Sequence, residues 1–166
     1  VRRNLTYDAC YTAVRASILS RLDYCNTLLA EIGPTQTHRL QKVQYQAARI
    51  LTKTRREVPM TPVLTSLHWL RIPNRIKFKL LTLAYKCQNM EMPNYLVKLL
   101  PAYKPSRSLR SASKLELSVT RVSKQVGSRA FSVAAVTLWN DLPVQIKNAK
   151  SIVQFKKLLK TYLFEM

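Results

Sequence analysis

Apolar and polar positions repeat every three to four residues over most of the chain, a spacing typical of amphipathic helices. The clearest run covers about residues 37–54. Its apolar positions follow steps of three and four: Leu40, Val43, Ala47, Ile50 and Leu51. We expect one long helix here, with these side chains facing a core.

Other segments predict further helices. The first covers about residues 6–22, with Thr6 as N-cap, and a short one follows over residues 23–31 before Gly33-Pro34. In the first helix the side chains expected to face inward are Ala9, Ala13, Ser17, Ile18 and Leu22. Later helices are expected after Pro73, from Ser128 to a point before Pro143, and after the cap Ser151. The last should bury Ile152, Phe155, Leu158, Leu159 and Tyr162.

Residues 103–126 break the helical pattern. Here Leu115, Leu117 and Val119 alternate with polar residues, which favours an extended, half-buried strand or loop. The chain has only two glycines, so a hairpin-rich β fold is disfavoured. The sequence therefore predicts a mainly α fold: an irregular multi-helix bundle with one extended basic strand or loop segment around 103–126.

The charge is strongly unbalanced. Lys and Arg number 28 against 8 Asp and Glu, giving a formal net charge of +20. Such an excess repels itself unless a polyanion neutralises it, and nucleic acid is the commonest polyanion for a globular domain. An acidic membrane surface is the second choice, but the basic residues are not confined to one amphipathic helix.

Two groups of residues are candidates for contacting phosphates. One is a stripe along the long helix that includes Gln46 and the cations Arg39, Lys42, Arg49 and Lys53, with no interleaved acids. The other lies between Tyr103 and Phe131, where hydroxyls separate the basic residues and Tyr103 could stack on a base. Its cations are Lys104, Arg107, Arg110, Lys114, Arg121, Lys124 and Arg129.

Catalytic or metal-binding groups are not evident in the sequence. No two acids are close enough to suggest a metal pair, and the two histidines lack ligand spacing. Cys10, Cys25 and Cys87 lie among apolar residues and are expected to be reduced core residues. Trp69 and Trp139 each precede a proline break, which favours core anchors over base-stacking platforms. We therefore expect no enzyme activity, metal or cofactor in this segment.

Six motifs, in order along the chain, resemble the C-terminal region of the reverse transcriptase polyprotein of LINE-type, non-LTR retrotransposons, close to the jockey and chicken-repeat group. They are SRLDYCNTLL, LQKVQYQAARILTKTRR, TPVLTSLHWLRIPNRIKFKLLTLAYK, PNYLVKLL, PSRSLRS and SRAFSVAAVTLWNDLP. The parent is an RNA-directed DNA polymerase expected to use Mg²⁺ at paired aspartates in its palm. This sequence has no Asp-Asp, so the resemblance implies a segment downstream of the palm.

The resemblance also implies an organisation. Residues 1–100 would form a thumb-like helical subdomain, 101–127 a basic extended connector, and 128–166 a C-terminal helical pair packing on the first part. Expected partners are RNA or DNA and the palm and fingers of the parent polymerase, with no membrane and no small-molecule substrate. The expected location is intracellular, in nucleus or cytoplasm.

Two other interpretations stay open at this point. The chain could be a basic helical protein-interaction module, or a relic of a decayed element without selected function. The clean caps and unbroken helical periods indicate only that the ability to fold survives.

Overall fold

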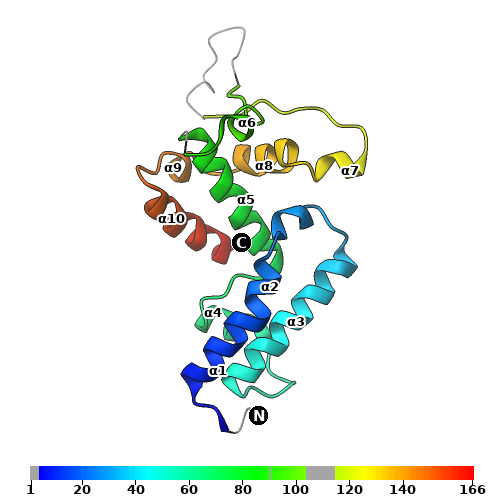
Figure 1. The fold of residues 1–166 in the computed structure, drawn as a ribbon, viewed down its shortest axis with the longest axis vertical. Helices are drawn as coiled ribbons and strands as arrows, with labels where there is room; N and C mark the ends of the chain where they lie inside the picture. The colour runs from blue at the N-terminus through cyan, green and yellow to red at the C-terminus, as the bar shows by residue number, and fades with distance from the viewer. Residues whose placement is uncertain (1–3, 90, 104–114) are drawn as a thin grey trace. The chain divides into compact units, whose positions relative to one another are not determined.

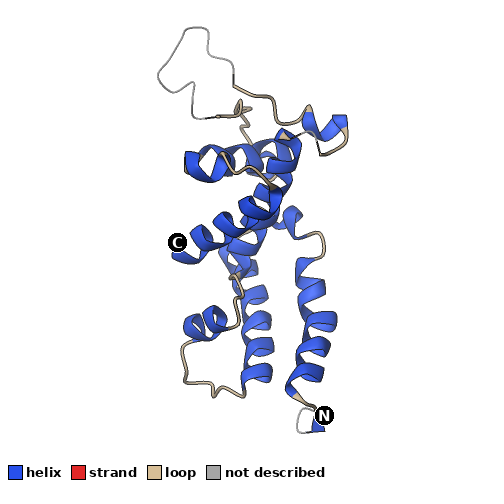
Figure 2. Cartoon of the chain, turned by 90° about the vertical axis from the view of Figure 1, so that its left-hand side faces the viewer, coloured by secondary structure: helices blue, strands red, loops and turns tan. Residues whose placement is uncertain are grey.

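A computed structural model describes residues 4–89, 91–103 and 115–166, and it confirms the mainly helical fold. No β-strand occurs in these ranges (Figure 2), where Ala102 and Leu117 form an isolated antiparallel bridge. The chain forms two compact units. Unit 1 comprises Val1–Asn26 and Ile32–Arg75, and unit 2 comprises Thr27–Glu31 and Ile76–Met166. The thumb-like, connector and C-terminal parts expected from the sequence stay predictions.

Unit 1 is built on two long helical stretches joined by shorter pieces (Figure 1). The first stretch consists of α1 (Tyr7–Val14), the π-helical segment η2 (Arg15–Leu19) and α2 (Ser20–Asp23). The second is α3 (Pro34–Thr52), followed by α4 (Met60–Ser66) and the first turn of α5 (Ile72–Gln88). Their shared core contains Cys10, Val14, Leu19, Ala47, Ala48, Leu51, Met60, Leu64 and Trp69.

The buried face of the first stretch differs from the expected one. Ala9, Ala13 and Ser17 are exposed, whereas Cys10, Val14 and Leu19 are buried. Cys10 and Val14 already share one face of α1, and a π-turn follows them, in which the N–H of Ser20 donates to the carbonyl of Arg15 five residues earlier. A wider turn keeps Leu19 on the face of Val14, although five residues separate them. Thr6 does cap the helix, because its hydroxyl accepts from the N–H of Ala9 at 3.3 Å.

The α3 core face is also rotated from the expected one. Val43 and Ile50 are 42% and 44% exposed, while Gln41 and Gln44 are buried. Both glutamines bind the backbone that links α4 to α5: Gln44 Nε2 donates to the Leu70 carbonyl at 2.8 Å, and Gln41 Oε1 accepts from the Ile72 N–H at 2.9 Å. Gly33-Pro34 starts this helix, since proline fits its first turn.

The short helix expected over residues 23–31 is only the 3₁₀ turn η3 (Asn26–Leu29). Unit 2 continues α5 and adds α6 (Asn94–Val97), α7 (Gln125–Ser128), α8 (Phe131–Asn140), α9 (Val144–Lys147) and α10 (Ile152–Glu165). The helix expected from Ser128 begins at Phe131 as α8, and Ser128 is instead the last residue of α7.

Aromatic side chains form the centre of unit 2. The Phe155 ring stacks on Tyr85 at 4.3 Å and on Trp139 at 6.1 Å between ring centroids. Trp139 is 3% exposed and Trp69, in unit 1, is 5% exposed, so the expectation that both are core anchors is confirmed. On α10, Leu163 is buried, whereas Leu158, expected to be buried, is 38% exposed. The hydroxyl of Ser151 caps α10 as expected, accepting from Gln154 N at 3.2 Å.

Candidate nucleic-acid interface

The outward side of α3 carries the first predicted group of cations. Ala47 and Ala48 are fully buried, so the opposite side of the helix faces solvent. Arg39, Lys42 and Lys53 are exposed there, together with Gln46. Within the described ranges, no acidic side chain forms an ion pair with these three cations. Their charges are therefore available to an anionic partner.

Arg49 behaves differently from the other cations of the stripe. Its side chain is half-buried, and Nη2 donates to the Arg56 carbonyl at 3.1 Å. This bond ties the last turn of α3 to the loop that follows. Arg49 therefore stabilises the loop, and only part of its charge faces solvent.

The end of α3 adds cations that the helical spacing did not identify. Lys53 terminates the helix with a left-handed backbone, φ 55°. Arg55 and Arg56 follow in the loop, and both are exposed. A cation at this position also interacts favourably with the negative end of the helix dipole. The adjacent basic pair was visible in the sequence, but a search at steps of three and four does not reach beyond the helix.

The second group is only partly described. Lys104, Arg107, Arg110 and Lys114 lie outside the described residues. Tyr103 is 48% exposed. Arg121, Lys124 and Arg129 are exposed, with Lys124 preceding α7 and Arg129 following it. The two groups belong to different units, so we describe them as separate surfaces.

The backbone on either side of residues 104–114 is closely paired. Tyr103 N donates to the Glu116 carbonyl and Ser118 N donates to the Pro101 carbonyl, each at 2.9 Å. Trp139 Nε1 donates to the Leu115 carbonyl at 2.9 Å. The extended course expected here is present, but Leu117 is 3% exposed while Leu115 and Val119 are 48% and 55% exposed. The side chain of Asn140 on α8 bonds the backbone of Leu117. Leu117 is therefore buried, and Leu115 and Val119 are not.

The thiols are of two kinds. Cys10 and Cys87 are buried, as expected, and burial raises the pKa of the Cys87 thiol. Cys25 is exposed, which contradicts the expectation of a core residue. The chain turns out of α2 at this point, with Tyr24 extended and Cys25 at φ 47°. No group of three or more His, Cys, Asp and Glu side chains that could hold a metal ion occurs in the described part of the chain.

Comparison with known proteins gives no match to any family model, curated protein or solved structure. The described helices include none that is long and apolar enough to cross a bilayer. The resemblance to retrotransposon polymerases thus stays a prediction based on sequence motifs.

Proposed function

We propose that this chain is a non-catalytic nucleic-acid-binding region of a LINE-type RNA-directed DNA polymerase, and that it grips template-primer or target nucleic acid through the phosphate backbone. The observation that carries the proposal is the outward side of α3, where Arg39, Lys42 and Lys53 are exposed and form no ion pair with a described acid. We call these three residues the α3 cations.

Their spacing suits a phosphate backbone. Arg39 and Lys53 are separated by about 21 Å of helix axis. A strand of duplex carries a phosphate at every base-pair step, so a helix of this length can approach several phosphates. Arg55 and Arg56 extend the positive surface past the end of α3.

The residue types favour binding without sequence preference. Lys and Arg on a solvent-facing side neutralise phosphates and release counterions, whereas sequence is read by base-edge contacts in the grooves. A polymerase must hold whatever sequence it copies. Arg121, Lys124 and Arg129 would add a second phosphate-binding surface in unit 2.

Exposed aromatic residues support association with the rest of a polymerase. Tyr7 is 52% exposed at the start of the first helical stretch of unit 1, and Tyr24, directly after this stretch, is 80% exposed. Tyrosines of this kind are enriched at protein interfaces. The palm and fingers are the partners that the resemblance implies, in the nucleus or cytoplasm.

A second candidate function, binding an acidic helix of a partner protein, is favoured by the same side of α3. Val43 and Ile50 are exposed beside the α3 cations. An amphipathic helix could place apolar residues against these two side chains and carboxylates against the cations. Charge loss would weaken both kinds of complex, so direct binding of purified nucleic acid separates the two functions.

The test measures fluorescence anisotropy of labelled RNA, DNA and hybrid duplexes of several unrelated sequences. Replacing the α3 cations by glutamine should weaken binding to every sequence by roughly tenfold or more. The matched control removes the same charge from exposed positions of unit 2 with Lys150→Gln, Lys156→Gln and Lys157→Gln. Equal losses in the two triple variants would contradict a specific role for α3, because they would indicate diffuse attraction to the total charge.

A further inference from the structure

Unit 1 contains a polar cavity of about 330 Å³, and none of the α3 cations lines it. It lies between the first helical stretch, Trp69 in the segment that links α4 to α5, and the start of α5. Its polar and aromatic lining residues are Tyr11, Arg15, Ser20, Asp23, Trp69 and Arg75. The volume is within the range of small-molecule sites in proteins.

The wall of this cavity includes the π-helical segment. Arg15 and Leu19, the two ends of η2, both line it. Single π-turns inside α-helices occur frequently at functional sites. The irregular turn and the cavity are independent observations at one place in the fold.

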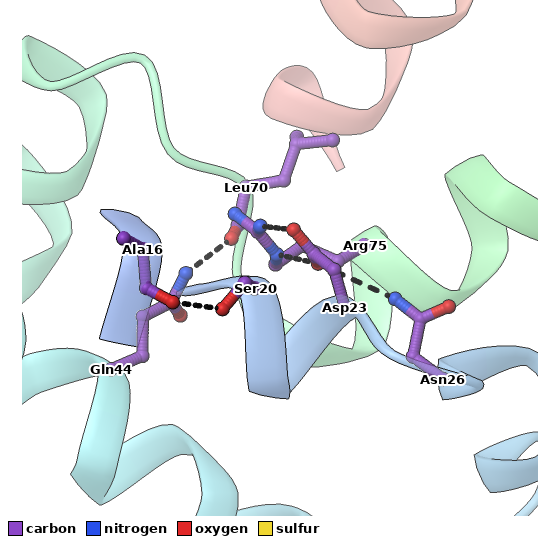
Figure 3. Close-up of polar contacts among 7 residues, drawn as sticks. All are labelled: Ala16, Ser20, Asp23, Asn26, Gln44, Leu70 and Arg75. Atoms are coloured by element: carbon purple, nitrogen blue, oxygen red, sulfur yellow. Dashed lines mark hydrogen bonds and ion pairs between the residues drawn. The ribbon is translucent and has the colours of Figure 1, made fainter. Parts of the chain in front are cut away.

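Arg75 is fixed in the cavity by an acid. Its Nε donates to Asp23 Oδ1 at 2.8 Å, and its Nη2 pairs with Oδ2 of the same carboxylate. Asn26 Nδ2 approaches Asp23 Oδ1 from another side at 3.5 Å (Figure 3). This arrangement uses one edge of the guanidinium and leaves the N–H groups of Nη1 for another acceptor.

Among the other side chains that line the cavity, hydrogen-bond donors outnumber acceptors. Arg15 is exposed and makes no ion pair with the described acids. The Ser20 hydroxyl donates to the Ala16 carbonyl, so toward the cavity it can only accept (Figure 3). Two guanidinium groups against the single carboxylate of Asp23 leave one net positive charge in the lining. Such a site favours an oxyanion.

The aromatic residues narrow the ligand class. Tyr11 is half-buried and contributes to the wall, whereas Trp69 lines the cavity but is a core anchor that is only 5% exposed. Aromatic walls bind nucleobases through their flat faces, and arginines bind phosphoryl oxygens in a bidentate way. A nucleoside monophosphate combines both groups at a size that suits the volume.

We propose that this cavity binds the phosphoryl group and base of a nucleoside 5′-monophosphate, with Arg15 and Arg75 at the phosphoryl oxygens and Tyr11 beside the base. The ligand is either a free nucleotide or the 5′-phosphorylated end of a strand, since the recognised chemistry is the same. This site goes beyond backbone binding by α3 and does not depend on it.

The test is calorimetric titration of the full chain with adenosine 5′-monophosphate, with adenosine and with inorganic phosphate. Saturable binding is expected for the nucleotide, with weaker binding of either part alone. Arg15→Ala should weaken nucleotide binding by about tenfold or more, because a charge-assisted hydrogen bond is lost. Arg21→Ala is the matched control: it removes one exposed arginine of the same stretch that does not line the cavity, and it should leave the affinity within about twofold.

Competition with oligonucleotides identifies the source of the ligand. Displacement of the nucleotide by a 5′-phosphorylated oligomer, but not by its 5′-hydroxyl counterpart, assigns the cavity to a strand end. Displacement by neither assigns it to a free nucleotide. Absence of saturable nucleotide binding at millimolar concentration, or equal losses in Arg15→Ala and Arg21→Ala, would overturn the proposal. Replacing the α3 cations should leave nucleotide binding intact. The failure of the cavity proposal can therefore be told apart from the failure of the proposed function of α3.

Discussion

The side chain of Asn140 bonds both backbone polar groups of Leu117. Its Oδ1 accepts from the Leu117 N–H at 2.8 Å, and its Nδ2 donates to the Leu117 carbonyl at 3.0 Å. The amide thus takes the place of a neighbouring strand at the end of α8. This contact, together with the Trp139–Leu115 bond, fixes residues 115–117 of the extended segment against the end of α8.

Replacing Asn140 by alanine should destabilise unit 2 by about 1–3 kcal/mol, because it leaves two buried backbone groups without partners. Urea unfolding monitored by circular dichroism measures the change. Gln145→Ala on the exposed side of α9 serves as control and should change the free energy of unfolding by less than about 0.5 kcal/mol. Equal stability of the two variants would show that Asn140 does not hold Leu117.

Replacing a buried glutamine of α3 by an apolar residue should lower the free energy of unfolding. Gln41 Nε2 donates to Gln44 Oε1 at 2.7 Å, so the two amides form one network with the backbone at residues 70 and 72. Gln44→Met keeps a similar volume but leaves the Leu70 carbonyl without a donor and Nε2 of Gln41 without an acceptor. We expect a loss of about 1–3 kcal/mol in the free energy of unfolding.

Gln46→Met is the control for this prediction. It makes the same chemical change on the exposed side of the same helix, where helix propensity is nearly unaffected. It should be close to neutral by urea unfolding. If Gln44→Met is as stable as Gln46→Met, the amide network does not position the start of α5.

The three thiols should differ in reactivity. Cys25 is exposed, whereas Cys10 and Cys87 are buried. At about pH 8, Ellman's reagent should modify one thiol quickly in the folded chain and all of them after unfolding. Cys25→Ser should abolish the fast phase. A fast phase that survives in this variant would contradict the burial of the other two.

Burial of Cys87 also predicts a pH dependence. Its pKa is raised in the folded state from the ordinary value of 9.0 by loss of solvation. The folded chain therefore holds this proton more tightly than the unfolded chain does. The stabilising contribution is complete below pH 9.0 and declines as the pH rises above it. Cys87→Ala should show a shallower loss of stability over this alkaline range, measured by urea unfolding, and an unchanged slope would contradict the assignment.

The cap of α10 gives a further prediction. Ser151→Ala should cost about 1 kcal/mol, because the N–H of Gln154 loses its acceptor, and Ser151→Asp should restore the stability. Thermal unfolding followed by circular dichroism is suitable. Ser123→Ala, at an exposed position before α7, is the control. Equal effects at the two serines would show that the cap contributes nothing.

The sequence predicted the helices well where a local rule decides the outcome. Thr6 and Ser151 cap their helices because a hydroxyl at such a position can satisfy a free N–H within one turn. Trp69 and Trp139 are buried because each has a large apolar area to remove from water.

The sequence predicted poorly which side of a helix is buried where side chains bond to backbone groups far along the chain. Gln44 replaces Val43 in the core because the Leu70 carbonyl, far along the chain, needs a donor. The π-turn before Ser20 places Leu19, five residues after Val14, on the buried face, and the periodicity of apolar positions does not reveal such a turn. The cavity beside Arg75 depends on a pairing with Asp23 that joins distant segments, so no spacing rule finds it.

The salt dependence of binding tests the central claim most directly, because each phosphate contact releases counterions. The logarithm of the affinity for duplex DNA is plotted against the logarithm of salt concentration for the full chain and for the two triple variants. Backbone binding by Arg39, Lys42 and Lys53 predicts a slope that flattens by roughly 0.9 for each lost contact in the α3 variant, and by less in the Lys150, Lys156 and Lys157 control. An unchanged slope in the α3 variant would contradict the account.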